Sequence, residues 1–546
     1  MNAENPIGYL VEIGPAQFVI HMIPAEQQSA ASDDSHADDP FEIGQVGSFL
    51  KVVQGDIVVL VQVERMYQEV LADGEEVIKL RAAPLGNYRP DGEFERGVAS
   101  YPTVGAEVFT VNTWELAKIF AKNTDANYKV GRLSSAESVN VFLDPSSFFG
   151  RHTAILGQTG SGKSWTVTSV MQSALKAMPN MHCILLDLHG EYRAKEKYGR
   201  QESPFPKDKC RTLDAAELEF PFWLLTFGEL VDLFVSSSDP NAAVQTAFLR
   251  ETVLALKREA NEALGKGHIT VDSPVYFDLD EMFERLKKAN EQKLEFGKKE
   301  APLHGRFEQM LVRLQSFFND SRYDFILRPK KRNATDTLPG LMRDFVGLGE
   351  PKANITILDL SAVPFDVAPV VTAQIGRLAY EFNFWNPQCH EFPIFLICEE
   401  AHQYISREDI ASHQEARRSM ERIAKNGRKY GVGLCVVSQR PHDLSETVLS
   451  QCGTYICMRI SNPDDQEYVR KLVPDASRGA LDALTSLARG EAIVMGEAAP
   501  IPVRFRVTMP DPPPSSRDIN YTEKWRSGPE DIAVEVLVNR WHRQIR

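Results

Sequence analysis

The fold of this chain is decided by one stretch, Gly157-Gln158-Thr159-Gly160-Ser161-Gly162-Lys163-Ser164. A short apolar run over residues 153–156 precedes it, and a helical pattern over residues 163–178 follows. Glycines allow successive backbone N–H groups to point at phosphate oxygens, at a helix N-terminus that favours negative charge. In such a loop the lysine reaches the β- and γ-phosphates, and the serine hydroxyl ligates Mg²⁺. The stretch therefore predicts a P-loop that binds ATP with Mg²⁺.

The alternative is a chance match in a Gly-rich turn, which the strand before and the helix after disfavour. We expect the nucleotide to be held by a set of loop residues and the first residues of the helix, with Lys163 also catalytic and Ser164 also a metal ligand: Gly157, Thr159, Gly160, Ser161, Gly162, Lys163, Ser164 and Trp165.

Beyond the P-loop, short apolar runs alternate with helical patterns. The runs cover residues 183–187, 355–359, 393–398, 432–437, 454–458 and 492–495. Near-continuous apolar strands between helices indicate a mainly parallel sheet that is covered on both faces. The sequence thus predicts an α/β fold with a mainly parallel sheet, which together with the P-loop resembles a RecA-like P-loop ATPase core.

Two further parts are expected outside this core. Short β-branched runs at residues 8–13, 17–23, 57–63 and 77–81 are typical of a small N-terminal β-barrel or β-sandwich, of which we expect the barrel. Charge-rich helical patterns over residues 242–264, 279–292 and 307–319 indicate a helical insertion. The predicted domains are the barrel (1–115), the core in two parts (116–212 and 347–510), the insertion (213–346) and a C-terminal extension (511–546).

The run Phe395-Leu-Ile-Cys-Glu399-Glu400 ends an apolar strand in two carboxylates, as a Walker B element does. One acid belongs to the Mg²⁺ shell, and a second orients and deprotonates the attacking water. We assign Glu399 to the metal and Glu400 to the catalytic base, although the usual first acid is Asp. The alternative is an acidic pair that caps the next helix.

Polar residues close two other strands. Gln439 follows the strand at 432–437 and is a candidate sensor of the γ-phosphate. The alternative is a polar residue that only caps the strand, which would give the same sequence pattern. Asp187 closes the strand at 183–187, and His189 and Glu191 lie just beyond it. Ligands of open α/β sheets bind at the carboxyl ends of strands, so these three side chains are expected to border the nucleotide.

A basic run contains Arg422, Lys425, Arg428 and Lys429. Its spacing alone fits a solvated helix face best. A functional alternative is an arginine supplied across a subunit boundary, which would stabilise charge on the transferring phosphoryl group. Arg151, just before the P-loop strand, is a weaker candidate for the same role.

Composition restricts the class of protein. The net charge of −14 disfavours broad coating of nucleic acid, although it allows a local basic channel. No apolar run reaches the roughly 18 residues of a membrane span, and the first residues do not resemble an export signal. Seven cysteines without a Cys-x-x-Cys pair argue against disulfides or zinc. We therefore expect a cytoplasmic protein with no membrane contact.

The motifs together resemble the HerA family of hexameric ATPases, which is related to the FtsK-type DNA pumps. The resemblance is carried by Gly157-Gln-Thr-Gly-Ser-Gly-Lys-Ser164, Asp187-Leu-His-Gly-Glu-Tyr192, Glu399-Glu-Ala-His402, and Gly427-Arg-Lys-Tyr-Gly431 leading to Ser438-Gln-Arg-Pro441. It implies a homohexamer with ATP at each interface and a central channel for double-stranded DNA. By position, Arg428 resembles the family's arginine finger, with Arg422 as the fallback.

The resemblance also implies an effector partner, either a NurA-like nuclease or a sirtuin-like NAD-consuming enzyme, the latter in anti-phage members. No nuclease set is found outside the ATPase motifs. Three hypotheses follow: a DNA-translocating motor, an ATP-binding scaffold that assembles and activates an effector, and a small-molecule P-loop kinase. The large size and the barrel argue against the kinase.

Overall fold

The computed structural model describes residues 5–24, 45–72, 74–89, 92–193, 195–197, 200–214, 218–262, 265, 267–292, 302–363, 367–408, 414–473, 479–516, 520–527 and 533–542. These residues form two compact units. The first unit comprises Met1–Pro179, Val437–His442 and Leu449–Pro513, and the second comprises Asn180–Val436, Asp443–Val448 and Pro514–Arg546.

The first unit begins with the predicted small β-barrel, which the structure confirms. Six strands close in the order β2-β1-β7-β3-β4-β5, and pairing of β5 with β2 completes the ring. Alternate side chains of these strands fill one apolar core, which includes Leu10, Phe18, Val61 and Val108. The bounds are β1 (Gly8–Ile13), β2 (Phe18–Met22), β3 (Phe49–Gln54), β4 (Ile57–Val70), β5 (Glu76–Tyr88), β7 (Glu107–Thr110) and, beside β5, β6 (Phe94–Arg96).

The rest of the first unit carries one part of the core sheet, in the order β10-β18-β19-β20-β8-β9. Only the first of these pairs, β10 with β18, is parallel, and the others are antiparallel. This part of the core sheet is therefore mixed, with its single parallel pair at one end. The strands are β8 (Lys129–Leu133), β9 (Ala136–Phe142), β10 (Thr153–Leu156), β18 (Thr454–Cys457), β19 (Glu491–Gly496) and β20 (Val503–Val507).

The second unit carries strands in the order β14-β15-β11-β16-β17, and all these pairs are parallel. Every residue of β11, β15 and β16 is buried, as expected for strands that are covered on both faces. The bounds are β11 (Cys183–Asp187), β14 (Cys210–Asp214), β15 (Ile355–Asp359), β16 (Ile394–Cys398) and β17 (Val432–Ser438), with a small hairpin of β12 (Lys195–Lys197) and β13 (Arg200–Glu202). The expected start of the insertion, residue 213, falls within β14.

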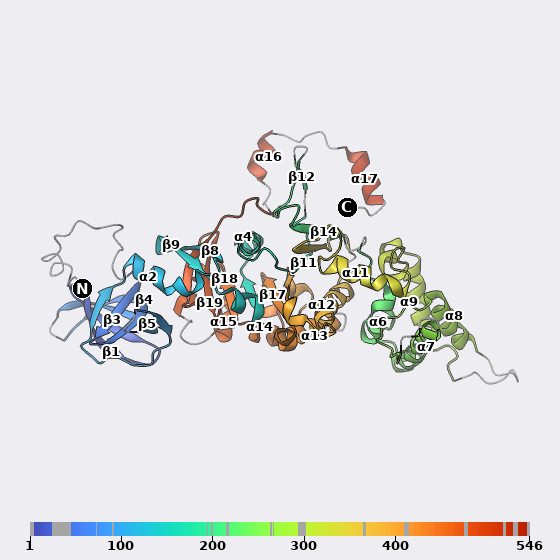
Figure 1. The fold of residues 1–546 in the computed structure, drawn as a ribbon, viewed down its shortest axis with the longest axis horizontal. Helices are drawn as coiled ribbons and strands as arrows, with labels where there is room; N and C mark the ends of the chain where they lie inside the picture. The colour runs from blue at the N-terminus through green and yellow to red at the C-terminus, as the bar shows by residue number, and fades with distance from the viewer. Residues whose placement is uncertain are drawn as a thin grey trace. The chain divides into compact units, whose positions relative to one another are not determined.

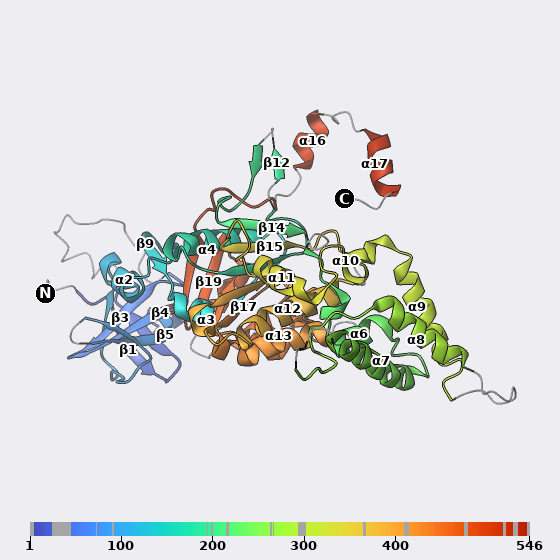
Figure 2. The same cartoon turned by 45° about the vertical axis from the view of Figure 1, so that its right-hand side comes forward.

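Helices occur where the sequence predicted them. In Figures 1 and 2 the insertion helices α7 (Ala242–Glu262), α8 (Leu279–Glu291) and α9 (Glu308–Phe318) lie side by side. The remaining α-helices are α2 (Thr113–Ile119), α3 (Pro145–Gly150), α4 (Lys163–Ala177), α6 (Phe227–Phe234), α10 (Asp324–Leu327), α11 (Leu338–Phe345), α12 (Ala368–Phe384), α13 (Gln414–Asn426), α14 (Glu446–Ser450), α15 (Pro463–Leu472), α16 (Tyr521–Ser527) and α17 (Val534–His542). No helix within the described residues is long and apolar enough to cross a membrane.

Candidate active site

The P-loop connects β10 to α4 in the first unit. Gly160 and Gly162 have φ angles of +76° and +109°, which L side chains rarely adopt, so glycine permits the curled path of the loop. Gly162 is the N-cap of α4, and no side chain caps this helix N-terminus. Lys163 Nζ lies 3.4 Å from the carbonyl oxygen of Gln158. An uncapped N-terminus beside a buried lysine is the donor set that phosphate groups require.

A methionine to which the sequence analysis gave no role packs directly against this loop. Met458, just after β18, has no solvent exposure. A Cβ atom placed on Gly157 would lie only 2.8 Å from the Cβ of Met458 and 2.7 Å from Ser161 Oγ. The hydroxyl of Thr166 donates to the Met458 sulfur at 3.4 Å. Glycine is therefore required at position 157 because the loop packs directly on Met458.

The predicted γ-phosphate sensor meets the P-loop. Gln439 directly follows β17, and its Oε1 accepts a hydrogen bond from the Thr159 hydroxyl. The backbone also joins the two segments, since Gly157 N–H donates to the carbonyl oxygen of Ser438 at 3.2 Å. Two candidate residues that are 280 positions apart in the sequence are thus brought together.

Three other residues predicted to hold the nucleotide have distinct surroundings. Ser161 is buried, and its hydroxyl contacts the Met458 sulfur at 3.9 Å. The indole N–H of Trp165 is buried without a hydrogen-bond partner among the described residues, while Ser164 remains half-buried. A buried donor without a partner in the first turn of α4 fits a ligand at this helix end.

The predicted metal ligand lies in the second unit. Glu399 directly follows β16 and is 6% exposed, and its Oε1 accepts a hydrogen bond from the Tyr192 hydroxyl. Burial raises the pKa of Glu399 to about 8, against a smaller lowering by this hydrogen bond. The carbonyl oxygen of Glu399 accepts from the Tyr404 hydroxyl at 3.0 Å. From the sequence, Tyr192 was expected only as a member of the Asp187–Tyr192 motif beside the nucleotide, and Tyr404 was not singled out.

The turn after β11 is organised by one carboxylate. Asp187 accepts hydrogen bonds from the backbone N–H groups of His189 (3.3 Å), Glu191 (3.0 Å) and Tyr192 (2.9 Å). Burial raises the pKa of Asp187, and these hydrogen bonds oppose the rise. The His189 side chain is exposed, and that of Glu191 is half-buried. Asp187 therefore shapes the turn by binding backbone N–H groups, and the charge of Glu191 acts on the nearby Glu399 carboxyl group.

The predicted base, Glu400, has an unusual backbone conformation. Its φ and ψ angles are 46° and 41°, in the left-handed region that few non-glycine residues adopt. Its Oε2 lies 3.4 Å from Nδ1 of His402, and both side chains are largely buried. Such conformations cost about 1–3 kcal/mol and cluster at functional sites, so the strain at Glu400 supports a functional role for this strand end.

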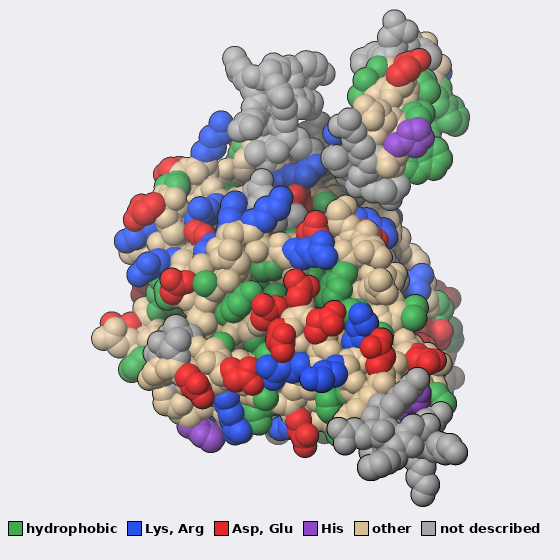
Figure 3. All heavy atoms as spheres, turned by 90° about the vertical axis from the view of Figure 1, so that its right-hand side faces the viewer, with side chains coloured by type: hydrophobic (Ala, Val, Ile, Leu, Met, Phe, Trp, Pro, Cys, Tyr) green, Lys and Arg blue, Asp and Glu red, His purple; other side chains and the backbone are tan. Residues whose placement is uncertain are grey.

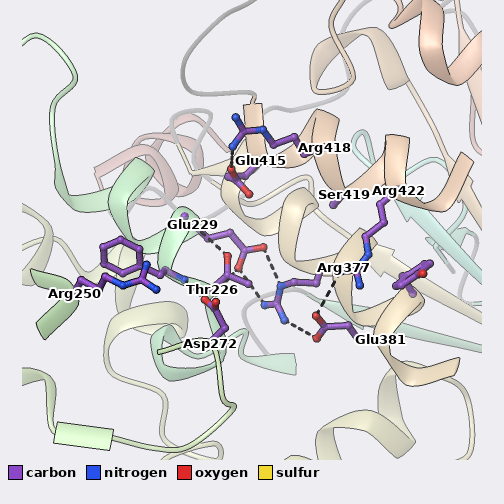
Figure 4. A pocket seen from close by; sticks show the side chains of 13 residues that line it. Thr226, Glu229, Arg250, Asp272, Arg377, Glu381, Glu415, Arg418, Ser419 and Arg422 are labelled. Atoms are coloured by element: carbon purple, nitrogen blue, oxygen red, sulfur yellow. Dashed lines mark hydrogen bonds and ion pairs between the residues drawn. The ribbon is translucent and has the colours of Figure 1, made fainter. Parts of the chain in front are cut away.

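The three candidate arginines differ in what they contact. The Arg422 guanidinium lies 4.3 Å from the ring centroid of Tyr380 and 4.0 Å from a carboxylate oxygen of Glu381. It borders a cavity of about 450 Å³ between α6, α12 and α13 (Figure 4). Arg151 forms an ion pair with Glu497. Arg428, in the 3₁₀ turn η8 (Gly427–Tyr430), is exposed and makes no ion pair with the described residues.

The described residues contain no group of three His, Cys, Asp or Glu side chains that could enclose a metal ion. Mg²⁺ is commonly held in proteins through one or two side chains together with phosphates and water. Ser164 and Glu399 have the oxygen ligands that the ion prefers.

Comparison with known proteins gives two matching family models. The model described as "Helicase HerA, central domain" matches residues 128–379, and "Helicase HerA-like C-terminal" matches residues 393–528. The chain is 29% identical to the "DNA double-strand break repair helicase HerA" of Sulfolobus acidocaldarius, over 81% of this chain and 80% of that protein. It is 28% identical to a probable helicase of Methanocaldococcus jannaschii, over 89% and 90%.

Among solved structures, VirB4 of Thermoanaerobacter pseudethanolicus aligns with a TM-score of 0.47 and 16% identity, over 70% of this chain and 96% of VirB4. The bacterial conjugative coupling protein TrwB aligns with a TM-score of 0.46 and 11% identity, over 73% and 93%. The two HerA models together cover the P-loop, the Asp187 turn, the Glu399–Glu400 pair and Gln439. This chain belongs to the HerA family of P-loop ATPases.

Proposed function

We propose that this chain is an ATP-driven motor that moves along double-stranded DNA as a homohexamer and drives a partner effector. The observation that carries the proposal is the uncapped N-terminus of α4 at the P-loop, where Thr159 meets Gln439. Supporting it, the relatives include proteins named as DNA double-strand break repair helicases. Nucleotide bound at such a site gives a motor its energy source.

In the proposed mechanism each side chain has one task. Lys163 binds the β- and γ-phosphates as a point charge, and Ser164 and Glu399 hold Mg²⁺. Glu400 accepts a proton from the attacking water, with His402 beside its carboxylate. Gln439 responds to the γ-phosphate through Thr159. Bound Mg²⁺ supplies charge neutralisation at the phosphates.

The neighbouring subunit completes this proposed site with an arginine. Arg428 is the better candidate than Arg422, because Arg422 is held by Tyr380 and Glu381 of its own chain. Arg428 is exposed and makes no ion pair with the described residues. The side chain of an arginine that acts in trans must extend away from its own subunit to reach the neighbouring one, which favours Arg428.

The test compares ATP turnover with and without duplex DNA, together with the size of the particle in solution. Lys163→Ala should lower turnover by about 100-fold or more, because it removes a charge from the transition-state site. Lys176→Ala is the matched control, since Lys176 is exposed near the other end of the same helix. A monomer whose turnover ignores DNA would contradict the motor.

A second candidate function is an ATP-binding scaffold that assembles and activates an effector without processive movement. The net charge of −14 favours it, because a channel for DNA should be basic. On the face of the molecule in Figure 3, acidic and basic side chains are interspersed and no field of one sign dominates. An effector that co-purifies with Lys163→Ala and stays active would support the scaffold, and one that needs hydrolysis would support the motor.

The effector is proposed to be a NurA-like nuclease or a sirtuin-like NAD-consuming enzyme. Either would supply the chemistry that the described ATPase motifs do not contain. Co-expression of the chain with the product of the neighbouring gene, followed by assays for DNA cleavage and NAD loss, distinguishes the two.

A further inference from the structure

The acid at the end of β16 is longer than the acid that is usual there. P-loop ATPases commonly place an Asp at the metal side of this strand end, whereas this chain has Glu399. The additional methylene adds a rotatable bond, which must be fixed if the carboxylate is to act as a ligand with defined geometry. The surroundings of Glu399 therefore need a device that holds its carboxyl group.

Tyr192 provides such a device. Its ring has no solvent exposure, and its hydroxyl donates to Oε1 of Glu399, which is itself 6% exposed. No described residue is recorded as a hydrogen-bond or ion-pair partner of Oε2 of the same carboxyl group. Tyr404 holds the residue differently, because its hydroxyl donates to the main-chain oxygen of Glu399 at 3.0 Å. Of these two tyrosines, only Tyr192 thus contacts the carboxyl group itself.

The position of Tyr192 is determined by the turn after β11. Strands β11 and β16 are paired in parallel, with Leu186 opposite Cys398, so both strands end at the same edge of the sheet. The Asp187 carboxylate accepts the N–H of Tyr192 at 2.9 Å, and Arg193 Nη1 contacts Asp359 Oδ2 at 2.9 Å. The backbone N–H of Tyr192 and the residue that follows it are thereby anchored, and the tyrosine side chain reaches the neighbouring strand end.

We propose that Tyr192 is a positioning residue that fixes Oε1 of Glu399, so that this longer acid presents Oε2 to the Mg²⁺ of bound nucleotide. The inference rests on the proposed ATPase function and adds to it a residue that acts on the metal through another side chain. Groups that orient metal ligands commonly contribute about 10- to 100-fold to metal affinity or activity.

The direct test removes one oxygen atom. Tyr192→Phe keeps the buried ring and deletes the hydroxyl. Affinity for a fluorescent ADP analogue is measured with EDTA and with Mg²⁺, which reads the metal site without turnover. We expect the metal-free affinity to change less than about twofold and the gain in affinity on adding Mg²⁺ to shrink by about tenfold.

Tyr404→Phe is the matched control. It deletes the same atom from an equally buried tyrosine that also bonds Glu399, but only at the main chain. It should leave the Mg²⁺-dependent gain within about twofold of the parent. Equal behaviour of the two variants would overturn the proposal, because the effect of Tyr192 would then be general packing. Thermal unfolding of both variants identifies any loss of fold.

A second variant tests whether Tyr192 acts through Glu399. Glu399→Asp shortens the acid so that it no longer reaches the hydroxyl, and Tyr192→Phe in that background should have almost no further effect on the Mg²⁺-dependent gain. Additive losses would overturn the proposal. If the parent chain binds Mg²⁺-nucleotide but does not hydrolyse ATP, the proposed function fails while this binding test still decides the role of Tyr192.

Discussion

The buried ion pair at Arg377 allows a prediction with a defined magnitude. Arg377 lies on α12 and is 10% exposed, and its Nε and Nη2 contact both carboxylate oxygens of Glu229 at 3.1 Å (Figure 4). Nη1 contacts Glu381 at 3.1 Å, and Nη2 donates to the carbonyl oxygen of Leu224 at 2.6 Å. Arg377→Ala leaves Glu229, which is 2% exposed, without its cation. Such a loss costs about 3–5 kcal/mol of unfolding free energy.

Chemical unfolding of the parent and variants, followed by circular dichroism, measures this loss. The matched control is Arg285→Ala, because Arg285 also pairs with two carboxylates, Glu259 and Glu281, but all three side chains are substantially exposed. That change should cost less than about 1 kcal/mol. Adding Glu229→Gln to Arg377→Ala removes the uncompensated charge and should recover part of the loss. Equal losses for the two arginine variants would refute the reasoning.

Three further predictions concern the site. Gly157→Ala should weaken ATP binding by at least about tenfold, because the new Cβ would lie 2.8 Å from Met458; an unchanged affinity in a titration with a fluorescent ATP analogue would contradict this. Gln439→Ala should lower turnover by about tenfold and leave binding of ATP intact, because Gln439 contacts the loop through Thr159; equal loss of binding and turnover would indicate a structural role instead. The pKa of Glu399 in the folded state, about 8, is above its ordinary value of 4.5. Between these values the folded state keeps the proton and the unfolded state loses it, so the stability that the Glu399 carboxyl group contributes is complete below pH 4.5 and is lost as pH rises through 8. Nucleotide-free parent protein should therefore lose up to about 1.4 kcal/mol per pH unit relative to Glu399→Gln in this window, measured by unfolding, and parallel pH profiles would contradict the assignment.

The strands of the core were predictable because nearly all their residues are apolar, which indicates strands that are buried on both faces. β11, β15 and β16 are continuous apolar runs and were expected at nearly the observed bounds. β14 was not expected as a strand, since it is an edge strand whose residues are half-buried or exposed and include Arg211 and Asp214. The direction of the strands was also not predictable from their apolar content. β19 is as apolar as a parallel strand, yet it is antiparallel to β18 and β20.

The candidate site was predictable at the level of strand ends. Gln439, Asp187 and Glu399 each follow an apolar run, and the structure finds each of them at the end of a strand. The contacts were not predictable, because they join residues far apart in the sequence. The Tyr192 hydroxyl meets a carboxyl group 207 positions away, and Met458 lies under a loop that begins at Gly157, 301 residues before it. No periodicity within one segment carries that information.

The arginines show why tertiary contacts change a functional assignment. Arg422 and Arg428 are six residues apart in one basic run, and neither their charge nor their spacing distinguishes their roles. In the structure Arg422 stacks on Tyr380, and a guanidinium held by a ring and a carboxylate must break both contacts before it can reach another subunit. Arg428 lies beyond the end of α13, on a 3₁₀ turn, where it has no such contact among the described residues. The smaller cost of redirecting its side chain is the reason why Arg428, rather than Arg422, is the arginine that we propose to act in trans.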